Sequence, residues 1–277
     1  MNKLGMILFS IAAVSCISQK EYTSPAGYDL NKPETFDMPA ILDEISGITF
    51  DGSSDTLYAI QDESGTVFHF KPGNAELSAT KFGKKGDYED LSISNGNIVV
   101  LRSDGSLFAF PLSETNLNEA VTVKEWKKAV PAGEYEALYA DPVSNDLYVL
   151  CKQCEADKKT NQVSGYILQW SGGELVLKSP FALDGTTIEK KKSKKSTLKP
   201  SALARNPRTG EWYILSSVNK SLLVADKDWK IKEAHALRPS LFPQPEGITF
   251  DKAGNLFISN EKDQEAYGTV LKFALKQ

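Results

Sequence analysis

Five short segments of the chain open with a polar residue that could hold a metal ion. The opening residues are Ser46, Glu89, Glu136, Ser201 and Glu246. Three of them are carboxylates, and carboxylates that converge repel one another unless a cation lies between them. Ca²⁺ accepts a flexible shell of carboxylate, carbonyl and water oxygens, whereas Mg²⁺ requires stricter octahedral geometry. If Glu89, Glu136 and Glu246 meet, they predict a calcium site; alternatively, each caps a strand, pairs with Lys or Arg, or is solvated.

The elements that must position these residues are copies of one strand pattern. After its opening residue, each copy has an alternating apolar run, a turn rich in Asp, Asn, Gly and Pro, a second run, and a third strand. The opening residues lie 43, 47, 65 and 45 residues apart, and a fourth strand follows in the first four copies. Such repeats are typical of propeller blades. We therefore predict an all-β, five-bladed β-propeller of four-stranded antiparallel blades, with an open sandwich of two sheets as the alternative.

The fifth copy ends after its third strand, at residues 268–275. Residues 28–39 precede the first copy and have no other partner. Pairing of these two segments would complete the last blade and remove an exposed edge. The sequence therefore predicts a single domain over residues 28–277 that is closed by its N- and C-terminal strands.

In such a ring the first strand of each blade borders the central channel, so the five opening residues should surround one mouth. The second strand returns to the same mouth. Pairing Ser46 with Gln61 by strand length places the ends of the second strands at this mouth. Their polar residues form a second set of candidate site residues, together with the two serines of the ring. They are Ser46, Ser201, Gln61, Asp62, Arg102, Asn260 and Glu261. Arg102 could neutralise Glu89 or bind an anionic ligand.

The chain contains few residues of the types that usually carry out catalysis. There are two histidines, His69 and His235, and neither has a ligand-like neighbour. No nucleophile is paired with a base, so acid–base work would fall to the glutamates themselves. We predict no catalytic residues and favour a binding or interaction module. The alternative is a metal-dependent hydrolase of phosphoesters or lactones at the channel mouth.

Two further features suggest local structure. Cys151 and Cys154 form the one C-x-x-C, which lacks the second pair that a zinc site needs. We expect a local disulfide, with two free thiols as the alternative. Six lysines lie between Lys190 and Lys199 in the longest interval between copies. They predict a solvated insertion; attraction to phosphate-bearing surfaces is the other interpretation.

The N-terminus has the pattern of an export signal. Lys3 precedes an apolar run from Leu4 to Val14, which is too short to span a bilayer. Cys16 follows at the end of this run and resembles the lipid-modified cysteine of bacterial lipoproteins, although Ala13 replaces the usual Leu. We predict a signal peptide over 1–15 and a lipidated Cys16 with a polar tether over 16–27, anchored to the membrane of the cell envelope. A plain signal peptide is the alternative.

The overall composition is that of a globular protein. Of 277 residues 41% are hydrophobic and 25% are charged, and the net charge is -4. This balance argues against a nucleic-acid partner, which usually requires a basic face. We expect a monomer whose ligand is an unknown protein or small molecule.

The repeats also resemble a known family. The copies EGITFDKAGNLFISNE and SGITFDGSSDTLYAIQDE, with the openings GDYEDL and GEYEAL, are similar to blades of the SdiA-regulated family of exported bacterial proteins, distant relatives of NHL-repeat propellers. The resemblance covers residues about 30 to 275. It implies a five-bladed propeller with a calcium site, and related six-bladed propellers include metal-dependent hydrolases.

Overall fold

A computed structural model describes residues 22–74, 76–160, 162–184, 198–263 and 267–276. The predicted signal peptide, Cys16 and most of the lysine-rich insertion lie outside these ranges. Within them, no helix has the length and apolar content needed to cross a membrane.

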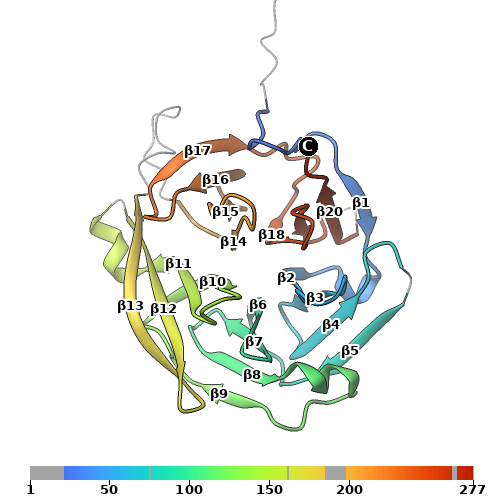
Figure 1. The fold of residues 1–277 in the computed structure, drawn as a ribbon, viewed down its shortest axis with the longest axis vertical. Helices are drawn as coiled ribbons and strands as arrows, with labels where there is room; N and C mark the ends of the chain where they lie inside the picture. The colour runs from blue at the N-terminus through green and yellow to red at the C-terminus, as the bar shows by residue number, and fades with distance from the viewer. Residues whose placement is uncertain (1–21, 75, 161, 185–197, 264–266, 277) are drawn as a thin grey trace, which may run out of the picture.

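The described residues form five four-stranded antiparallel sheets arranged around a common axis, as predicted (Figure 1). Blade 1 holds β2 (Ile45–Phe50), β3 (Leu57–Gln61), β4 (Thr66–Phe70) and β5 (Leu77–Lys81). Blade 2 holds β6 (Tyr88–Ser94), β7 (Asn97–Arg102), β8 (Leu107–Pro111) and β9 (Lys124–Trp126). Blade 3 holds β10 (Gly133–Ala140), β11 (Leu147–Cys154), β12 (Gln162–Ser171) and β13 (Glu174–Asp184).

Blade 4 holds β14 (Ala202–Arg205), β15 (Trp212–Ser216), β16 (Ser221–Ala225) and β17 (Ile231–Ala236). Blade 5 holds β18 (Pro245–Phe250), β19 (Leu256–Asn260), β20 (Thr269–Phe273) and β1 (Glu34–Asp37). In the part of the chain that the structure describes, three short 3-10 helices lie outside the blades: η1 (Ala40–Leu42), η2 (Leu112–Asn116) and η3 (Glu155–Lys159). The inner strands β2, β6, β10, β14 and β18 surround the axis (Figure 1).

The N-terminal strand closes the ring. Strand β1 pairs antiparallel with β20, from Glu34 opposite Lys272 to Asp37 opposite Thr269. This confirms the predicted closure and leaves no unpaired edge on β20. The prediction followed from a strand that was missing from the fifth copy.

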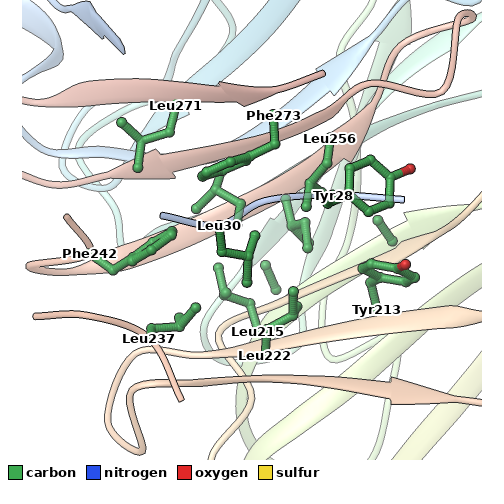
Figure 2. Packing of buried hydrophobic residues seen from close by; sticks show 14 of the residues in the cluster. Tyr28, Leu30, Tyr213, Leu215, Leu222, Leu237, Phe242, Leu256, Leu271 and Phe273 are labelled. Atoms are coloured by element: carbon green, nitrogen blue, oxygen red, sulfur yellow. The ribbon is translucent and has the colours of Figure 1, made fainter. Parts of the chain in front are cut away.

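The core consists of five apolar clusters, one between each pair of neighbouring blades. They arise because residues alternate sides along each strand, so both faces of a blade are apolar. The cluster between blades 4 and 5 contains Tyr28 and Leu30 from the segment that precedes β1 (Figure 2). The Tyr28 hydroxyl donates to the Gly254 carbonyl at 2.7 Å. The N-terminal segment is therefore part of the core as well as of the last sheet.

Part of the segment predicted as a tether also contacts the propeller. The Thr23 hydroxyl lies 2.8 Å from Nδ1 of His235 on β17, and Lys276 donates its backbone N–H to the Gly27 carbonyl at 2.8 Å. Thr23 and Gly27 thus belong to the propeller although the sequence predicts a tether there, because polar residues that look like a linker have partners on blades 4 and 5. We call residues 22–31 the N-terminal strap.

Candidate metal centre

The three glutamates of the predicted ring stand at β-bulges. Tyr88 pairs with Arg102 and Asp90 with Leu101, which leaves Glu89 as an extra residue in β6. Similar register shifts flank Glu136 in β10 and Glu246 in β18. A bulge re-aims the side chain of the extra residue. These irregularities lie near the start of the inner strands, and we call the face where these strands start the start face.

The bulge in blade 1 corrects one predicted pairing. Gln61 lies opposite Ile45 rather than Ser46, because two residues of β2, Ser46 and Gly47, face Ile60 alone. The backbone N–H of Asp62 then reaches the Glu44 carbonyl at 3.4 Å. Glu44 is thereby placed at the start face, although the sequence pattern did not single it out.

Five carboxylates gather at this face. The side chains of Glu44, Asp62 and Glu261 offer oxygens that all lie within 4.8 Å of one another. The charge of Glu246 raises the pKa of Glu261, and the charges of Glu246 and Glu261 raise the pKa of Glu89, so these side chains also lie close together. We call Glu44, Asp62, Glu89, Glu246 and Glu261 the acidic cluster. It includes two of the three predicted ring glutamates and two residues of the second set, Asp62 and Glu261.

Burial and mutual repulsion disfavour the ionised carboxylates of the acidic cluster, and the charge of Lys152 offsets only part of this at Glu89, Glu246 and Glu261. Burial, followed by the nearby charges of Glu246, Asp62 and Glu44, raises the pKa of Glu261 to about 8. Burial and the charge of Asp87 raise the pKa of Glu89 to about 8 as well. Burial also raises the pKa values of Glu246 and Asp62. Within the described ranges, no Lys or Arg lies within ion-pair distance of any member of the cluster.

Glu136, the third predicted ligand, is not part of this cluster. Its carboxylate is buried and pairs with the Lys152 ammonium, which also lies 3.2 Å from Glu134. The alternative interpretation of the ring glutamates, a pairing with Lys, therefore describes Glu136. Lys152 reaches Glu136 from the neighbouring strand β11, so the spacing of the opening residues alone could not decide between a metal ligand and an ion pair.

The two ring serines link neighbouring blades. The Ser46 hydroxyl donates to the Glu89 carbonyl at 2.6 Å, and the Ser201 hydroxyl donates to the Pro245 carbonyl at 2.9 Å. Ser259 makes a third bond of this kind to the Ser46 carbonyl at 2.6 Å. These donors hold adjacent blades together, so Ser46 acts in ring closure. The Ser201 side chain also hydrogen-bonds to the Glu246 carboxylate of the acidic cluster.

Three other members of the second set also have structural partners. Arg102 makes two bonds to Asp104, at 3.0 and 2.9 Å, and does not neutralise Glu89. The Gln61 side chain accepts the Ser64 backbone N–H at 2.9 Å. Asn260 is fully buried and donates to Leu241 and Thr269. Each was placed near the correct mouth by strand direction, but its side chain serves its own blade.

Asp90 is a buried acid that the sequence did not flag. It follows Glu89 and accepts backbone N–H groups from Leu91 at 2.8 Å and from Leu138 of blade 3 at 2.7 Å. Complete burial raises its pKa well above the usual range. Gly47 of blade 1 allows this close packing, because a Cβ at position 47 would overlap Asp90. Asp90 therefore joins blades 1, 2 and 3 close to the acidic cluster.

A hollow of about 340 Å³ opens beside the acidic cluster, on the side of blades 3 to 5. We call it the lysine hollow. Its lining consists of Glu136, Lys152, Lys199, Ser201, Ser217, Val218, Lys220, Gln244 and Glu246. Glu246 belongs to both the lysine hollow and the acidic cluster, so the two adjoin. A separate hollow of about 360 Å³ lies at the opposite mouth, lined by the far ends of all five inner strands.

Cys151 and Cys154 are joined in a disulfide that brackets Lys152. Both sulfurs are buried, and Cys154 packs against the Tyr135 hydroxyl at 3.6 Å. A Cβ at Gly133 would overlap the Cys154 sulfur, so a glycine is required opposite the bridge. The disulfide therefore fixes the end of β11 from which Lys152 reaches Glu136.

The sequence profile of the SdiA-regulated family matches residues 25–264, which cover blades 1 to 4, three of the four strands of blade 5 and the acidic cluster. The chain belongs to the SdiA-regulated family. A search of curated proteins found no match to this SdiA-regulated protein.

Several solved structures have a similar fold. A luciferin-regenerating enzyme aligns with a TM-score of 0.53 at 11% identity, over 88% of this SdiA-regulated chain and 99% of its own. Regucalcin from Agrobacterium tumefaciens, a calcium-binding protein, has a TM-score of 0.53 at 13% identity, with 91% and 95% covered. An aldose sugar dehydrogenase from Streptomyces coelicolor has a TM-score of 0.55 at 9% identity, with 88% and 98% covered. At these identities the likeness shows the fold alone.

Proposed function

We propose that this protein is a calcium-binding propeller of the cell envelope that acts as a binding module through its start face. The observation that carries the proposal is the acidic cluster, five carboxylates without an ion-paired Lys or Arg in the described part of the chain. A divalent cation among them would replace mutual repulsion with attraction. The cluster is irregular and drawn from blades 1, 2 and 5, which suits the flexible coordination of Ca²⁺ better than the octahedral shell of Mg²⁺.

Two considerations favour a binding module over the alternative, a metal-dependent hydrolase. Neither histidine contacts the acidic cluster: the His69 ring lies tilted against Tyr58, and His235 contacts Thr23 and Glu233. The carboxylates that could act as bases are the same ones that would ligate the cation. Regucalcin, which has a similar fold, is a calcium-binding protein, in agreement with the proposal. At 13% sequence identity, none of its ligand residues is carried over to this chain.

Calcium should raise the melting temperature of the chelator-treated protein. The ion binds the assembled cluster but not the unfolded chain. A free calcium concentration of 100 times the dissociation constant therefore adds about 2.7 kcal/mol to the free energy of unfolding. For a chain of this size we expect an increase of about 5 to 8 °C at pH 8. Thermal denaturation with calcium, with magnesium and with chelator alone measures this. Equal melting temperatures in all three would contradict the proposal.

The attachment to the envelope is a separate part of the proposal and rests on Cys16 after the apolar run that ends at Val14. A cysteine that carries two acyl chains anchors a protein stably, whereas one chain does not. The full-length protein expressed in a bacterium should partition into detergent, and Cys16→Ala should move it to the aqueous phase with an unchanged melting temperature. Equal partitioning of both proteins would refute the lipid anchor.

A further inference from the structure

The lysine hollow and the acidic cluster place opposite charges side by side at the start face. Lys152, Lys199 and Lys220 line the hollow on blades 3 and 4, and the acidic cluster lies on blades 5, 1 and 2. Glu246 is the residue they share, and the charges of Lys152 and Lys220 both act on it. A ligand that fills the hollow would therefore contact ammonium groups on one side and lie against the cluster on the other.

Two of these lysines have no charged partner. Lys152 is neutralised by Glu136 and Glu134. In contrast, the Lys220 ammonium donates to the Pro243 carbonyl, and the Lys199 ammonium donates to the Gln153 side chain at 3.2 Å. Over the described ranges, no carboxylate lies within ion-pair distance of either one. Each ammonium has three N–H donors, so both have donors left for a ligand.

The fold holds Lys220 in place at some energetic cost. It lies in the turn between β15 and β16 with a positive φ of 48°, a conformation that side-chain-bearing residues rarely adopt. Its carbonyl accepts the Leu237 backbone N–H at 2.8 Å. The side chain is partly buried, and this burial lowers its pKa. The charges of Glu246 and Asp263 act on Lys220 from beyond ion-pair distance. A partly desolvated cation that has no carboxylate in direct contact and is fixed over a hollow suits an anion-binding site.

We propose that the lysine hollow binds a small oxyanion, a phosphate monoester or a carboxylate, that contacts Lys199 and Lys220 and completes the oxygen shell of the cation on the acidic cluster. This inference rests on the proposed function, because the cation supplies the second contact. Ca²⁺ takes six to eight oxygens, and ligand oxygens fill positions that the protein leaves open. Lysine binds phosphate as a point charge, and two ammonium groups with Ca²⁺ balance a dianion better than a monoanion. Methyl phosphate should therefore bind more tightly than acetate.

Calorimetric titration of methyl phosphate and of acetate into the calcium-loaded protein tests this. We expect methyl phosphate to bind, and chelation of calcium to weaken its binding at least about tenfold. Lys220→Met removes the charge but keeps the stem and the backbone conformation, and it should weaken methyl phosphate binding about tenfold. Lys199→Met is a second, independent variant with the same expected result. Calcium titrated alone should bind both variants at least as tightly as the parent, because each substitution removes a positive charge near the acidic cluster.

The matched control is Lys227→Met. Lys227 is exposed, pairs with Asp228, and lies in the turn after β16, at the other end of the strand from Lys220. Its substitution should leave methyl phosphate binding unchanged. Tighter binding of acetate than of methyl phosphate would contradict the charge argument and overturn the assignment of the hollow to a phosphate monoester. Absence of binding by both anions, or equal weakening by Lys227→Met, would overturn the inference.

The titrations also separate this inference from the proposed function. Calcium is titrated alone first, and a flat calcium titration would overturn the proposed function. Methyl phosphate binding that needs Lys220 but not calcium would overturn the bridging contact and retain an anion site of lysines alone. Calcium binding without any anion binding would leave the proposed function standing and reject the inference.

Discussion

Replacing Glu89 with glutamine should stabilise the calcium-free protein at pH 9. Burial holds the pKa of Glu89 at about 8 instead of its usual 4.5, so the folded state keeps a proton that the unfolded state releases. This costs stability as pH rises above about 4.5, and the cost is complete above about 8. Glutamine removes it, with an expected gain of about 3 to 5 kcal/mol at pH 9 and little change at pH 4.5. Urea denaturation at both pH values in chelator measures the gain.

Glu136→Gln is the matched control, since it makes the same substitution at the equivalent position of blade 3. Glu136 is buried and paired with Lys152, so its loss leaves a partly buried ammonium with Glu134 as its remaining partner. We expect a destabilisation of about 1 to 3 kcal/mol at both pH values and little change in calcium affinity. In Glu89→Gln, calcium affinity should fall. Destabilisation of similar size in both variants would mean that Glu89 has only a structural role.

Removing the N-terminal strap together with β1 should abolish cooperative folding of the whole ring. A chain that begins at Met38 lacks Tyr28 and Leu30, which are 5% and 3% exposed in the core between blades 4 and 5. It also exposes the edge of β20. Truncating one large buried side chain alone costs about 3 to 5 kcal/mol, which is a large part of a domain's stability. Circular dichroism on heating, with solubility, measures the loss.

The control for this truncation is a chain that begins at Tyr22, which keeps the contacts of Thr23 with His235, of Tyr28 with Gly254 and of Asn31 with Tyr22. It should melt cooperatively and serves as the reference. A chain from Met38 whose melting temperature lies within about 2 °C of this reference would show that closure by β1 is dispensable.

The fold could be predicted because its signals are local. Alternating strands and turn residues recur in each copy, and the strand missing from the fifth copy identified residues 28–39 as its partner. The strap was the exception. Tyr22 to Gly27 has a polar composition typical of a linker, and its contacts with His235 and Lys276 come from residues more than 200 positions away.

The sequence predicts at which mouth of the channel the site lies, but not which side chains form it. Strand direction placed Asp62, Glu89, Glu246 and Glu261 together. This inference requires only that the start of each first strand and the end of each second strand be recognised in the sequence. Bulges decide where each side chain points, and no sequence signal marked them in advance. The register of blade 1 brought in Glu44.

Side chains with a partner in a neighbouring strand were the other source of error. Glu136 was predicted as a ligand, and Lys152 of β11 takes it as a counter-ion. Ser46 was predicted to face the ring, and its hydroxyl binds a carbonyl of blade 2. Both outcomes depend on which residue of the adjacent strand lies opposite. The spacing of residues along one strand carries no information about that neighbour.

Direct titration of calcium into chelator-stripped protein, at pH 6 and pH 8.5 and in buffers of different ionisation enthalpy, tests the calcium site most directly. Glu89 and Glu261 have pKa values of about 8, so both are mostly protonated at pH 6 and must lose their protons to ligate the ion. We predict tighter binding at pH 8.5 and the release of roughly two protons per calcium at pH 6. No binding heat at either pH, or binding with the same affinity at both and no proton release, would contradict a calcium site on the acidic cluster.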